Sequence, residues 1–274
     1  MDCFTLLAMT MFFNVKTMKP FWRWLILVAI ALVLLQLYFV VRIAAMLVID
    51  PQSTAFQRSE AWRVATQKDA LRWRQQWLPY DKISNNLKRA VIASEDDGFA
   101  NHDGVDWNAL EKAWERNARA EEQAARAQAR LDARKPPKVA AKTPPAKQVK
   151  PPKVVGGSTI TQQLAKNLFL SGERTMFRKG QEFVLALLLE AMLSKERILE
   201  IYLNNVEWGE GVFGAEAAAQ HYFRKSAAQL SSYQAARLAV MLPRPKYFEK
   251  LPNSSYVAGR AALIARRLEG AELP

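Results

Sequence analysis

Residues 94–106 read SEDDGFANHDGVD, and residues 156–167 read GGSTITQQLAKN. The first stretch follows the apolar run 90–93, which predicts that Glu95 stands at the end of a packed helix. A carboxylate beside apolar side chains has its charged form disfavoured, so we expect a raised pKa suited to acid–base chemistry. The alternative is a solvated or calcium-binding acidic loop. The stretch lacks the regular Asp-x-Asp-x-Asp spacing and the distal Glu of a calcium loop.

The second stretch predicts a capped helix. Thr159 and Gln162 fit a capping box at its start. On this helix Gln162 shares a face with Lys166, and Gln163 with Asn167, because residues four apart lie one above the other. A helix N-terminus with hydroxyls, amides and a lysine suits a phosphate, although the Gly-Lys-Ser/Thr order of a nucleotide P-loop is missing. Taken alone, a well-capped surface helix is an equally good interpretation.

Two further segments contain candidate functional residues. Glu182 lies among Arg174, Arg178 and Lys179 at the start of an apolar helix. Such an acid is either part of a structural salt bridge or a positioned second carboxylate, and the residues alone favour the salt bridge. Residues 200–214 read EIYLNNVEWGEGVFG, a helix end followed by three spaced glycines. That pattern is typical of a shaped loop that packs against a site and supports it.

An apolar block lies near the N-terminus. It runs from Leu25 to Val41, interrupted only by Gln36, and resumes over 43–49. Together these residues exceed the roughly 20 needed to span the hydrocarbon core of a bilayer as a helix. A cleaved signal peptide is the alternative, but the block is too long and no small-x-small cleavage site follows it. We therefore predict an uncleaved transmembrane helix over 25–49.

The charges before this block predict its orientation. Lys16, Lys19 and Arg23 precede it, and positively charged flanks stay in the cytoplasm. The N-terminus is therefore expected inside, with Met18 as an alternative start to Met1. The predicted domain plan is a cytoplasmic segment 1–24, a transmembrane helix 25–49, and a periplasmic domain 50–274 with a basic Pro/Lys-rich insertion at about 120–153.

The rest of the chain predicts a mainly helical protein with few strand signals. Trp62, Trp73 and Trp77 stand at roughly helical spacing, which predicts a helix within 50–80. We expect further helices within the stretches 81–114, 115–131, 179–204, 227–243 and 254–269. The stretch 115–131 is predicted to be solvated, and 179–204 to be a buried helix followed by another.

The composition narrows the function classes. The formal net charge of +13 suits a polyanionic neighbour, namely nucleic acid, anionic lipid headgroups or a phosphorylated substrate, although a solubilising charge is the plain alternative. Residues 134–153 hold seven Lys or Arg, six Pro and no acid, which predicts a solvated loop. The single cysteine, Cys3, excludes an intrachain disulfide and cysteine zinc sites, and two histidines argue against a histidine-rich metal site.

The four motifs, in this order, resemble the family 51 glycosyltransferases of bacterial peptidoglycan synthesis. Over roughly 82–247 the chain matches Glu-Asp-x-x-Phe-x-x-His-x-Gly-x-Asp, Gly-x-Ser-Thr-Ile-x-Gln-Gln-Leu-x-Lys-Asn, Arg-Lys-x-x-Glu and Ile-Leu-Glu-x-Tyr-Leu-Asn in full, interrupted by the basic insertion. The resemblance implies a mainly α fold, with a lysozyme-like head lobe and a smaller membrane-associated jaw lobe after one N-terminal transmembrane helix. With no penicillin-binding transpeptidase domain after residue 274, the chain is similar to the monofunctional members.

The resemblance also implies the site and the reaction. The catalytic base corresponds to Glu95 and a second carboxylate to Glu182. The residues carried over to the donor side are Ser158, Thr159, Gln162, Gln163, Lys166 and Asn167, with Arg174 reaching the pyrophosphate. The implied reaction polymerises lipid II into β-1,4-linked glycan strands by inversion and releases undecaprenyl pyrophosphate. The sequence requires no cofactor, and a divalent cation, Mg²⁺ or Mn²⁺, is an optional addition.

The expected partners are lipid II, the growing glycan chain, membrane lipids, and division or elongation synthases, with the protein in the inner membrane. A lysozyme-like hydrolase or lytic transglycosylase is the first alternative, but it has no use for Lys166 and Arg174. A non-catalytic membrane scaffold is the second, and Glu95 and Glu182 argue against it. A nucleic-acid binder would suit the basic insertion, but export across the membrane separates it from nucleic acid.

Overall fold

The computed structural model describes residues 19–67, 73–133, 156–170 and 175–274. The chain forms two compact units, Met1–Asp50 and Pro51–Pro274.

The described part of the first unit is one long helix, α2 (Pro20–Ala45). Pro20 occupies the first helical turn, where its fixed φ suits a helix and its missing N–H costs nothing. At about 1.5 Å per residue, its 26 residues exceed the ~30 Å of a hydrocarbon core. Among the described helices, α2 alone is long and apolar enough to cross a membrane. The predicted N-terminal apolar helix is therefore confirmed, shifted from 25–49 to Pro20–Ala45.

In the second unit, three helices pack together: α4 (Asn85–Glu95), α10 (Ser232–Met241) and α12 (Ser255–Ala265). A serine caps the N-terminus of each helix, its hydroxyl accepting a hydrogen bond from a free backbone N–H of the first turn. Alanines are buried on all three helices, and small side chains let helix axes approach closely. The packing holds the C-terminal end of α4 in a fixed place.

A second group of helices surrounds α6 (Ile160–Phe169). It contacts α3 (Ala55–Gln67), α7 (Met176–Met192) and α8 (Lys195–Asn205). The helix and successor predicted over 179–204 are α7 and α8, so the two helices are confirmed. The predicted burial is only partly right, because Val184 and Leu187 of α7 are exposed. Since α6 carries most of the predicted donor-side residues, these contacts fix their positions.

A small sheet, which the sequence did not signal, joins distant segments. Its order is β1 (Arg74–Gln75), β3 (Val212–Phe213) and β2 (Glu207–Gly209), with β1 parallel and β2 antiparallel to β3. The helix predicted from the three tryptophans is therefore only partly right. Trp62 lies on α3, but Trp73 lies next to β1, with its ring 4.4 Å from that of Phe213.

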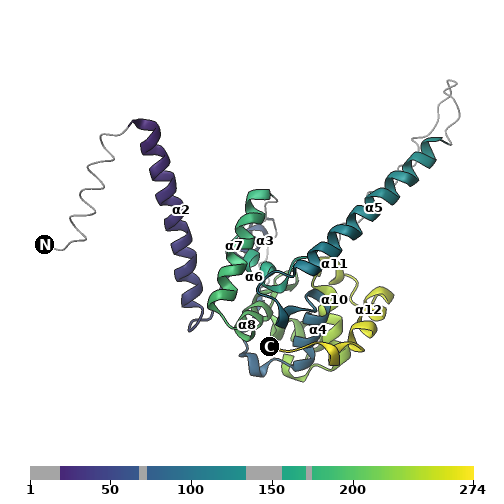
Figure 1. Ribbon diagram of the computed structural model, residues 1–274. Helices are drawn as coiled ribbons and strands as arrows, with labels where there is room; N and C mark the ends of the chain where they lie inside the picture. The colour runs from purple at the N-terminus through teal and green to yellow at the C-terminus, as the bar shows by residue number, and fades with distance from the viewer. Residues whose placement is uncertain (1–18, 68–72, 134–155, 171–174) are drawn as a thin grey trace. The chain divides into compact units, whose positions relative to one another are not determined.

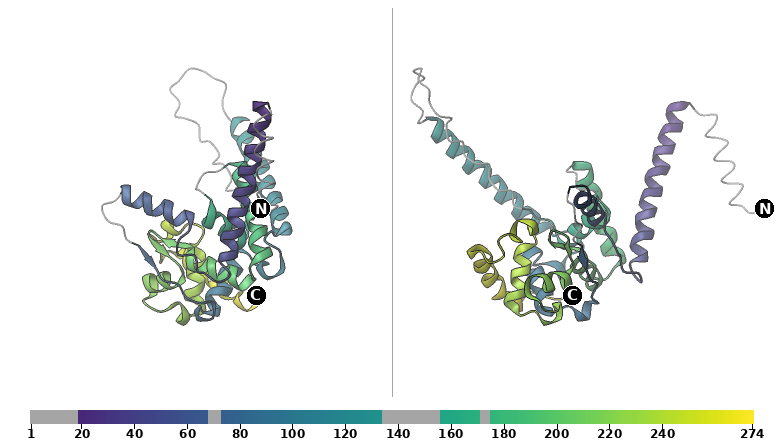
Figure 2. Two further views of the ribbon diagram at one scale, coloured as in Figure 1. Left: turned by 90° about the vertical axis from the view of Figure 1, so that its left-hand side faces the viewer. Right: turned by 180° about the vertical axis from the view of Figure 1, so that it is seen from behind.

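Helix α5 (Trp107–Ala133) extends away from the other helices of its unit (Figures 1 and 2). The solvated helix predicted over 115–131 is confirmed. Ion pairs one turn apart, Arg119 with Glu115 and Arg126 with Glu122, lie along its exposed surface. The first residues of the predicted insertion at about 120–153 belong to this helix, and 134–153 lie outside the described residues.

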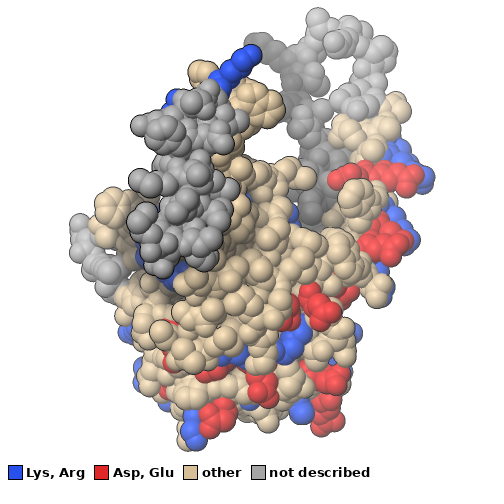
Figure 3. All heavy atoms as spheres, turned by 60° about the vertical axis from the view of Figure 1, so that its left-hand side comes forward, with Lys and Arg blue, Asp and Glu red and all other residues tan. Residues whose placement is uncertain are grey.

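The remaining elements complete the second unit. They are the helices α9 (Ala215–Phe223) and α11 (Pro245–Phe248) and the short 3-10 turns η1 (Tyr80–Lys82), η2 (Phe99–Asn101), η3 (Ala227–Gln229) and η4 (Leu268–Gly270). The predicted helices within 227–243 and 254–269 are confirmed as α10 and α12. On the face drawn in Figure 3, acidic and basic side chains are interspersed over the lower part of the molecule.

Candidate active site

Glu95 is the last residue of α4, as the sequence predicted. Leu87, Val91 and Ile92 of this helix are fully buried, while the Glu95 side chain is half-buried. Burial raises the pKa of Glu95 above the ordinary carboxyl value; the hydrogen bond from Gln163 lowers it, the charge of Asp96 raises it, and the charge of Lys166 lowers it. Burial wins, so Glu95 is a stronger base than a solvated carboxylate.

A neutral side chain from α6 holds this carboxylate. Gln163 Nε2 donates to Glu95 Oε2 at 3.1 Å, and Tyr202 Oη donates to Gln163 Oε1 at 2.9 Å. Tyr202 belongs to α8 and is 1 % exposed. Three helices therefore meet at one hydrogen-bonded chain that ends on the predicted base.

The next residue, Asp96, links the end of α4 to the start of α6. Its Oδ1 lies 2.9 Å from His102 Nε2, and its Oδ2 accepts from the backbone N–H of Ile160 at 2.8 Å. Asp96 is buried. A carboxylate that accepts from a helix N-terminal N–H also interacts favourably with the helix dipole. Asp96 therefore anchors the two predicted motifs to each other.

The start of α6 is a complete capping box. Thr159 Oγ1 accepts from the backbone N–H of Gln162, and Gln162 Oε1 accepts from that of Thr159. Thr159 Oγ1 also donates to the carbonyl of Gly104 at 2.6 Å. Gly104 has φ +84°, and a Cβ there would lie 2.9 Å from Glu190 Cγ, so glycine is required. Both Thr159 and Gln162 are buried, and their hydrogen bonds fix the position of the helix start.

A second polar group lies at the start of α7. Glu182 is 3 % exposed and is paired with Lys179, and its Oε2 lies 3.8 Å from Arg178 Nη1. Lys179 Nζ also donates to Ser158 Oγ at 3.2 Å. The salt bridge favoured by the sequence is therefore confirmed, and it reaches one of the predicted donor-side residues. The predicted Arg174 lies outside the described residues.

The other two predicted donor-side residues lie further along α6. Lys166 is exposed and Asn167 is half-buried. The charge of Lys166 acts on Glu95, which places an ammonium group near the predicted base. This part of α6 thus offers a cation and an amide beyond the capping box.

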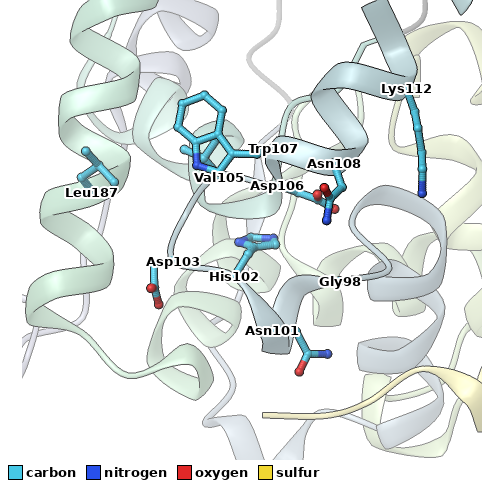
Figure 4. Close-up of a pocket in the computed structure, with 10 residues that line it drawn as sticks. All are labelled: Gly98, Asn101, His102, Asp103, Val105, Asp106, Trp107, Asn108, Lys112 and Leu187. Carbon is cyan, nitrogen blue, oxygen red and sulfur yellow. The ribbon is translucent and has the colours of Figure 1, made fainter. Parts of the chain in front are cut away.

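A cavity of about 640 Å³ lies beside the loop that follows Glu95 (Figure 4). His102 stands near its centre, and Trp107, Asn108 and Lys112 contribute from α5. None of the predicted site residues lines it. Within the described ranges, no group of three or more His, Cys, Asp or Glu side chains is arranged to hold a metal ion. The optional divalent cation stays a prediction.

The sequence profile of the family described as Transglycosylase matches residues 63–127 and 145–269. This chain belongs to the transglycosylase family. Membership gives the second unit a lysozyme-like, mainly helical fold, which confirms the predicted fold class. It also confirms that the chain is an enzyme.

Relatives support the same assignment. A Burkholderia thailandensis protein named Biosynthetic peptidoglycan transglycosylase is 54% identical over 239 residues, which cover 87% of this chain and 82% of the relative. A Herminiimonas arsenicoxydans protein of the same name is 50% identical over 260 residues, which cover 94% of this chain and 100% of the relative.

Sequence reasoning gave no role to three residues that hydrogen-bond in the candidate site or beside it. Tyr202 and Asp96 were quoted within motifs but given no role of their own. Lys195 was not singled out; its Nζ lies 2.8 Å from Glu190 Oε1, which also accepts from Thr161 at 2.6 Å. The signal for Tyr202 was its place in the matched motif Glu-x-Tyr-Leu-Asn. Its partner on α6 followed from no spacing rule, because the two residues lie 39 positions apart.

Proposed function

We propose that this transglycosylase polymerises lipid II into β-1,4-linked glycan strands at the outer face of the cytoplasmic membrane. Glu95 carries the proposal: a half-buried carboxylate of raised pKa, held at a helix end by a neutral amide. The names of the relatives point to peptidoglycan as the polymer.

In the proposed reaction, Glu95 acts as the general base. The 4-hydroxyl of the N-acetylglucosamine of lipid II attacks C1 of the N-acetylmuramic acid at the end of the growing chain. Glu95 accepts the proton of that hydroxyl as the new bond forms. The bond from C1 to the pyrophosphate oxygen breaks, undecaprenyl pyrophosphate leaves, and the α-linkage becomes β in a single inversion.

Two cationic residues, one on α6 and one before α7 in the sequence, would bind the leaving group. Lys166 is exposed on α6, and Arg174 precedes α7 in the sequence. Their charges would offset the negative charge that grows on the pyrophosphate, with Mg²⁺ or Mn²⁺ as an optional addition. The salt bridges from Glu182 to Lys179 and Arg178 support a role for Glu182 in orienting cations at this end of the site. Ser158 and Asn167 would contribute polar contacts to the donor.

Membrane anchoring fits a reaction between two lipid-linked substrates. Lys19 and Arg23 lie at the start of α2, which supports a cytoplasmic N-terminus and a periplasmic second unit in the inner membrane. In the second unit, Met176 and Phe177 are 89% and 82% exposed at the start of α7, and Trp114 is 77% exposed on α5. Such side chains suit contact with lipid. Synthases of division or elongation are further proposed partners, and nucleic acid is not.

A hydrolase that cuts the same polymer is the alternative function. It would need a carboxylic acid that protonates a glycosidic oxygen, with a second carboxylate close by. Glu182 is instead buried in ion pairs with two cations, which favours synthesis over cleavage.

The test is polymerisation of labelled lipid II by the full-length protein in detergent. We expect Glu95→Gln to lower the rate by roughly 10² to 10⁴-fold, because the amide cannot accept the proton. The neighbouring exposed carboxylate provides the control, and Asp97→Asn is expected to keep the wild-type rate. Equal polymerisation by wild type and Glu95→Gln would overturn the assignment of the base. Degradation of finished glycan without polymerisation would support the hydrolase instead.

A further inference from the structure

Tyr202 reaches the active site from α8, a helix that carries none of the predicted catalytic or donor-side residues. Its hydroxyl lies 2.9 Å from Gln163 Oε1, and Gln163 Nε2 lies 3.1 Å from Glu95 Oε2. The tyrosine is 1 % exposed, so its hydroxyl is shielded from water. Both polar ends of the Gln163 amide are thus used within the protein, one by the predicted base and one by Tyr202.

The direction of the two hydrogen bonds follows from the chemistry of the groups. An ionised carboxylate only accepts, so the amide must turn its NH₂ towards Glu95. The amide oxygen then faces Tyr202, whose hydroxyl must donate. Burial raises the pKa of Tyr202 well above its ordinary value, and the charges of Glu95 and Asp96 raise it further, so the hydroxyl keeps its proton. The ionised carboxylate accepts a stronger hydrogen bond from the amide NH₂ than a protonated carboxyl does, so the chain favours the ionised form of Glu95.

We propose that Tyr202 and Gln163 are positioning residues that hold Glu95 Oε2 in one orientation and favour its ionised form between turnovers. This proposal rests on the proposed role of Glu95 as the base. It assigns Gln163 to the base rather than to the donor substrate, and it gives α8 a direct part in the reaction. After Glu95 accepts the acceptor proton, the pair favours release of that proton and readies the enzyme for the next addition.

Other charges act on Glu95 as well, and they set the background for a test. Asp96, next to it at the end of α4, raises its pKa, and Lys166 on α6 lowers it. Neither side chain is changed by a substitution at Tyr202 or Gln163. A shift in the pH dependence of catalysis after such a substitution therefore reports the loss of the hydrogen-bonded chain.

The decisive variant is Tyr202→Phe, which removes one hydroxyl and keeps the ring. Without the Tyr202 hydroxyl, the Gln163 amide is less firmly held and forms its hydrogen bond to Glu95 less often. The ionised form of Glu95 is then less stabilised, so the pKa of Glu95 rises. We expect the acidic limb of the kcat profile to move to higher pH by roughly 0.5 to 1 unit. At a pH on that limb, kcat falls about three- to tenfold, and KM for lipid II stays unchanged. Gln163→Met is expected to move the limb in the same direction, and adding Tyr202→Phe to it changes nothing further.

The matched control is Tyr222→Phe. The Tyr222 hydroxyl donates to the carbonyl of Trp208 at 2.7 Å, so this variant loses one tyrosine hydrogen bond elsewhere in the fold. It is expected to keep the wild-type pH profile. A merely structural role for Tyr202 would lower kcat equally at every pH and leave the acidic limb in place, and that result would overturn the proposal. So would a rise in KM for Gln163→Met without a shift of the limb.

The two proposals fail in different ways. If the wild type does not polymerise lipid II, the proposed function is wrong, and if Glu95→Gln polymerises it at the wild-type rate, the assignment of the base is wrong. If both behave as expected while Tyr202→Phe and Gln163→Met keep the wild-type profile, only the positioning proposal is wrong. Should Tyr202→Phe not fold, Gln163→Met still decides the matter, because Gln163 is half-buried and makes the hydrogen bond to Glu95 itself.

Discussion

Two regions of the second unit hold buried or half-buried carboxylates with different kinds of partner. At the end of α4, Glu95 is held by the neutral amide of Gln163. Between α3, β2 and α11, Glu60 and Glu207 are both buried and share the ammonium group of Lys246, while Arg63 pairs with Glu60. A neutral hydrogen-bond donor fixes the orientation of a carboxylate and leaves it basic, whereas direct cationic partners make it part of a structural salt bridge.

The second region is the α3/β2/α11 cluster, which consists of Glu60, Arg63, Glu207 and Lys246. Within this one cluster, the pKa of one carboxylate is lowered and that of another is raised. Burial would raise the pKa of Glu60, but hydrogen bonds from Arg63 and Lys246 outweigh it, and the net direction is down. Burial raises the pKa of Glu207 to about 7, which the charge of Lys246 only partly offsets and that of Glu60 reinforces. Glu207 is therefore the carboxylate here that titrates near neutral pH.

The largest effect on stability is expected from Lys246→Met. It removes the cation shared by two buried carboxylates and leaves them to repel each other. Because Lys246 is itself partly exposed, we expect a loss of about 2 kcal/mol in the free energy of unfolding, measured by urea titration in detergent at pH 8.

The matched control for this variant is Lys250→Met, at an exposed lysine close by in the sequence. It is expected to change stability little. If both lysine variants lose the same stability, the salt bridges of Lys246 do not stabilise the fold, and the contrast with the Glu95 region fails.

A smaller effect is expected from pH. The folded-state pKa of Glu207, about 7, lies above the ordinary carboxyl value, so between these values the folded state binds more protons than the unfolded chain. The stabilisation from this group is complete below about pH 4.5 and is lost as pH rises towards 7. We expect a decline of about 1 to 3 kcal/mol from this group over that window. Urea titrations from pH 4.5 to 8 should show a flatter profile for Glu207→Gln than for wild type, and parallel profiles would contradict the assignment.

The smallest effect is expected on the exposed helix α5. Glu115→Gln breaks the ion pair with Arg119, in which both side chains are more than half exposed. An exposed pair one turn apart contributes less than about 0.5 kcal/mol and is screened by salt. Thermal unfolding should barely distinguish this variant from wild type. A loss comparable to that of Lys246→Met would mean that α5 makes contacts on which the fold depends.

Much of this architecture was predictable because its signals are local. The apolar block predicted α2, the run Ala90–Ala93 placed Glu95 at a helix end, and Thr159 with Gln162 predicted the cap that α6 carries. Each of these rests on residues within a few positions of one another.

What the sequence did not predict depends on contacts between distant residues. Strand β1 has two residues and forms only because β3 offers an edge to it, so no local pattern marks it. The partners of Glu95 on α6 and α8 likewise follow from packing. Motif resemblance put Gln163 near the donor, while the geometry turns its amide towards the base. The cluster around Lys246 joins residues from three distant parts of the chain, and none was singled out as a site.

The end of α4 gives two neighbouring carboxylates different partners: Glu95, the proposed base, accepts from Gln163, and Asp96 accepts from the backbone at the start of α6. Successive residues of a helix differ in direction by about 100°, so this division depends on the rotational phase of α4 as well as on residue type. One residue added within the helix would turn its end by about that angle. It would disrupt both the position of Glu95 and the hydrogen bond from α6 to Asp96. We therefore expect the number of residues between Ser84 and Glu95 to be constrained as tightly as the proposed base itself, and length variation in this protein to occur in α5 instead.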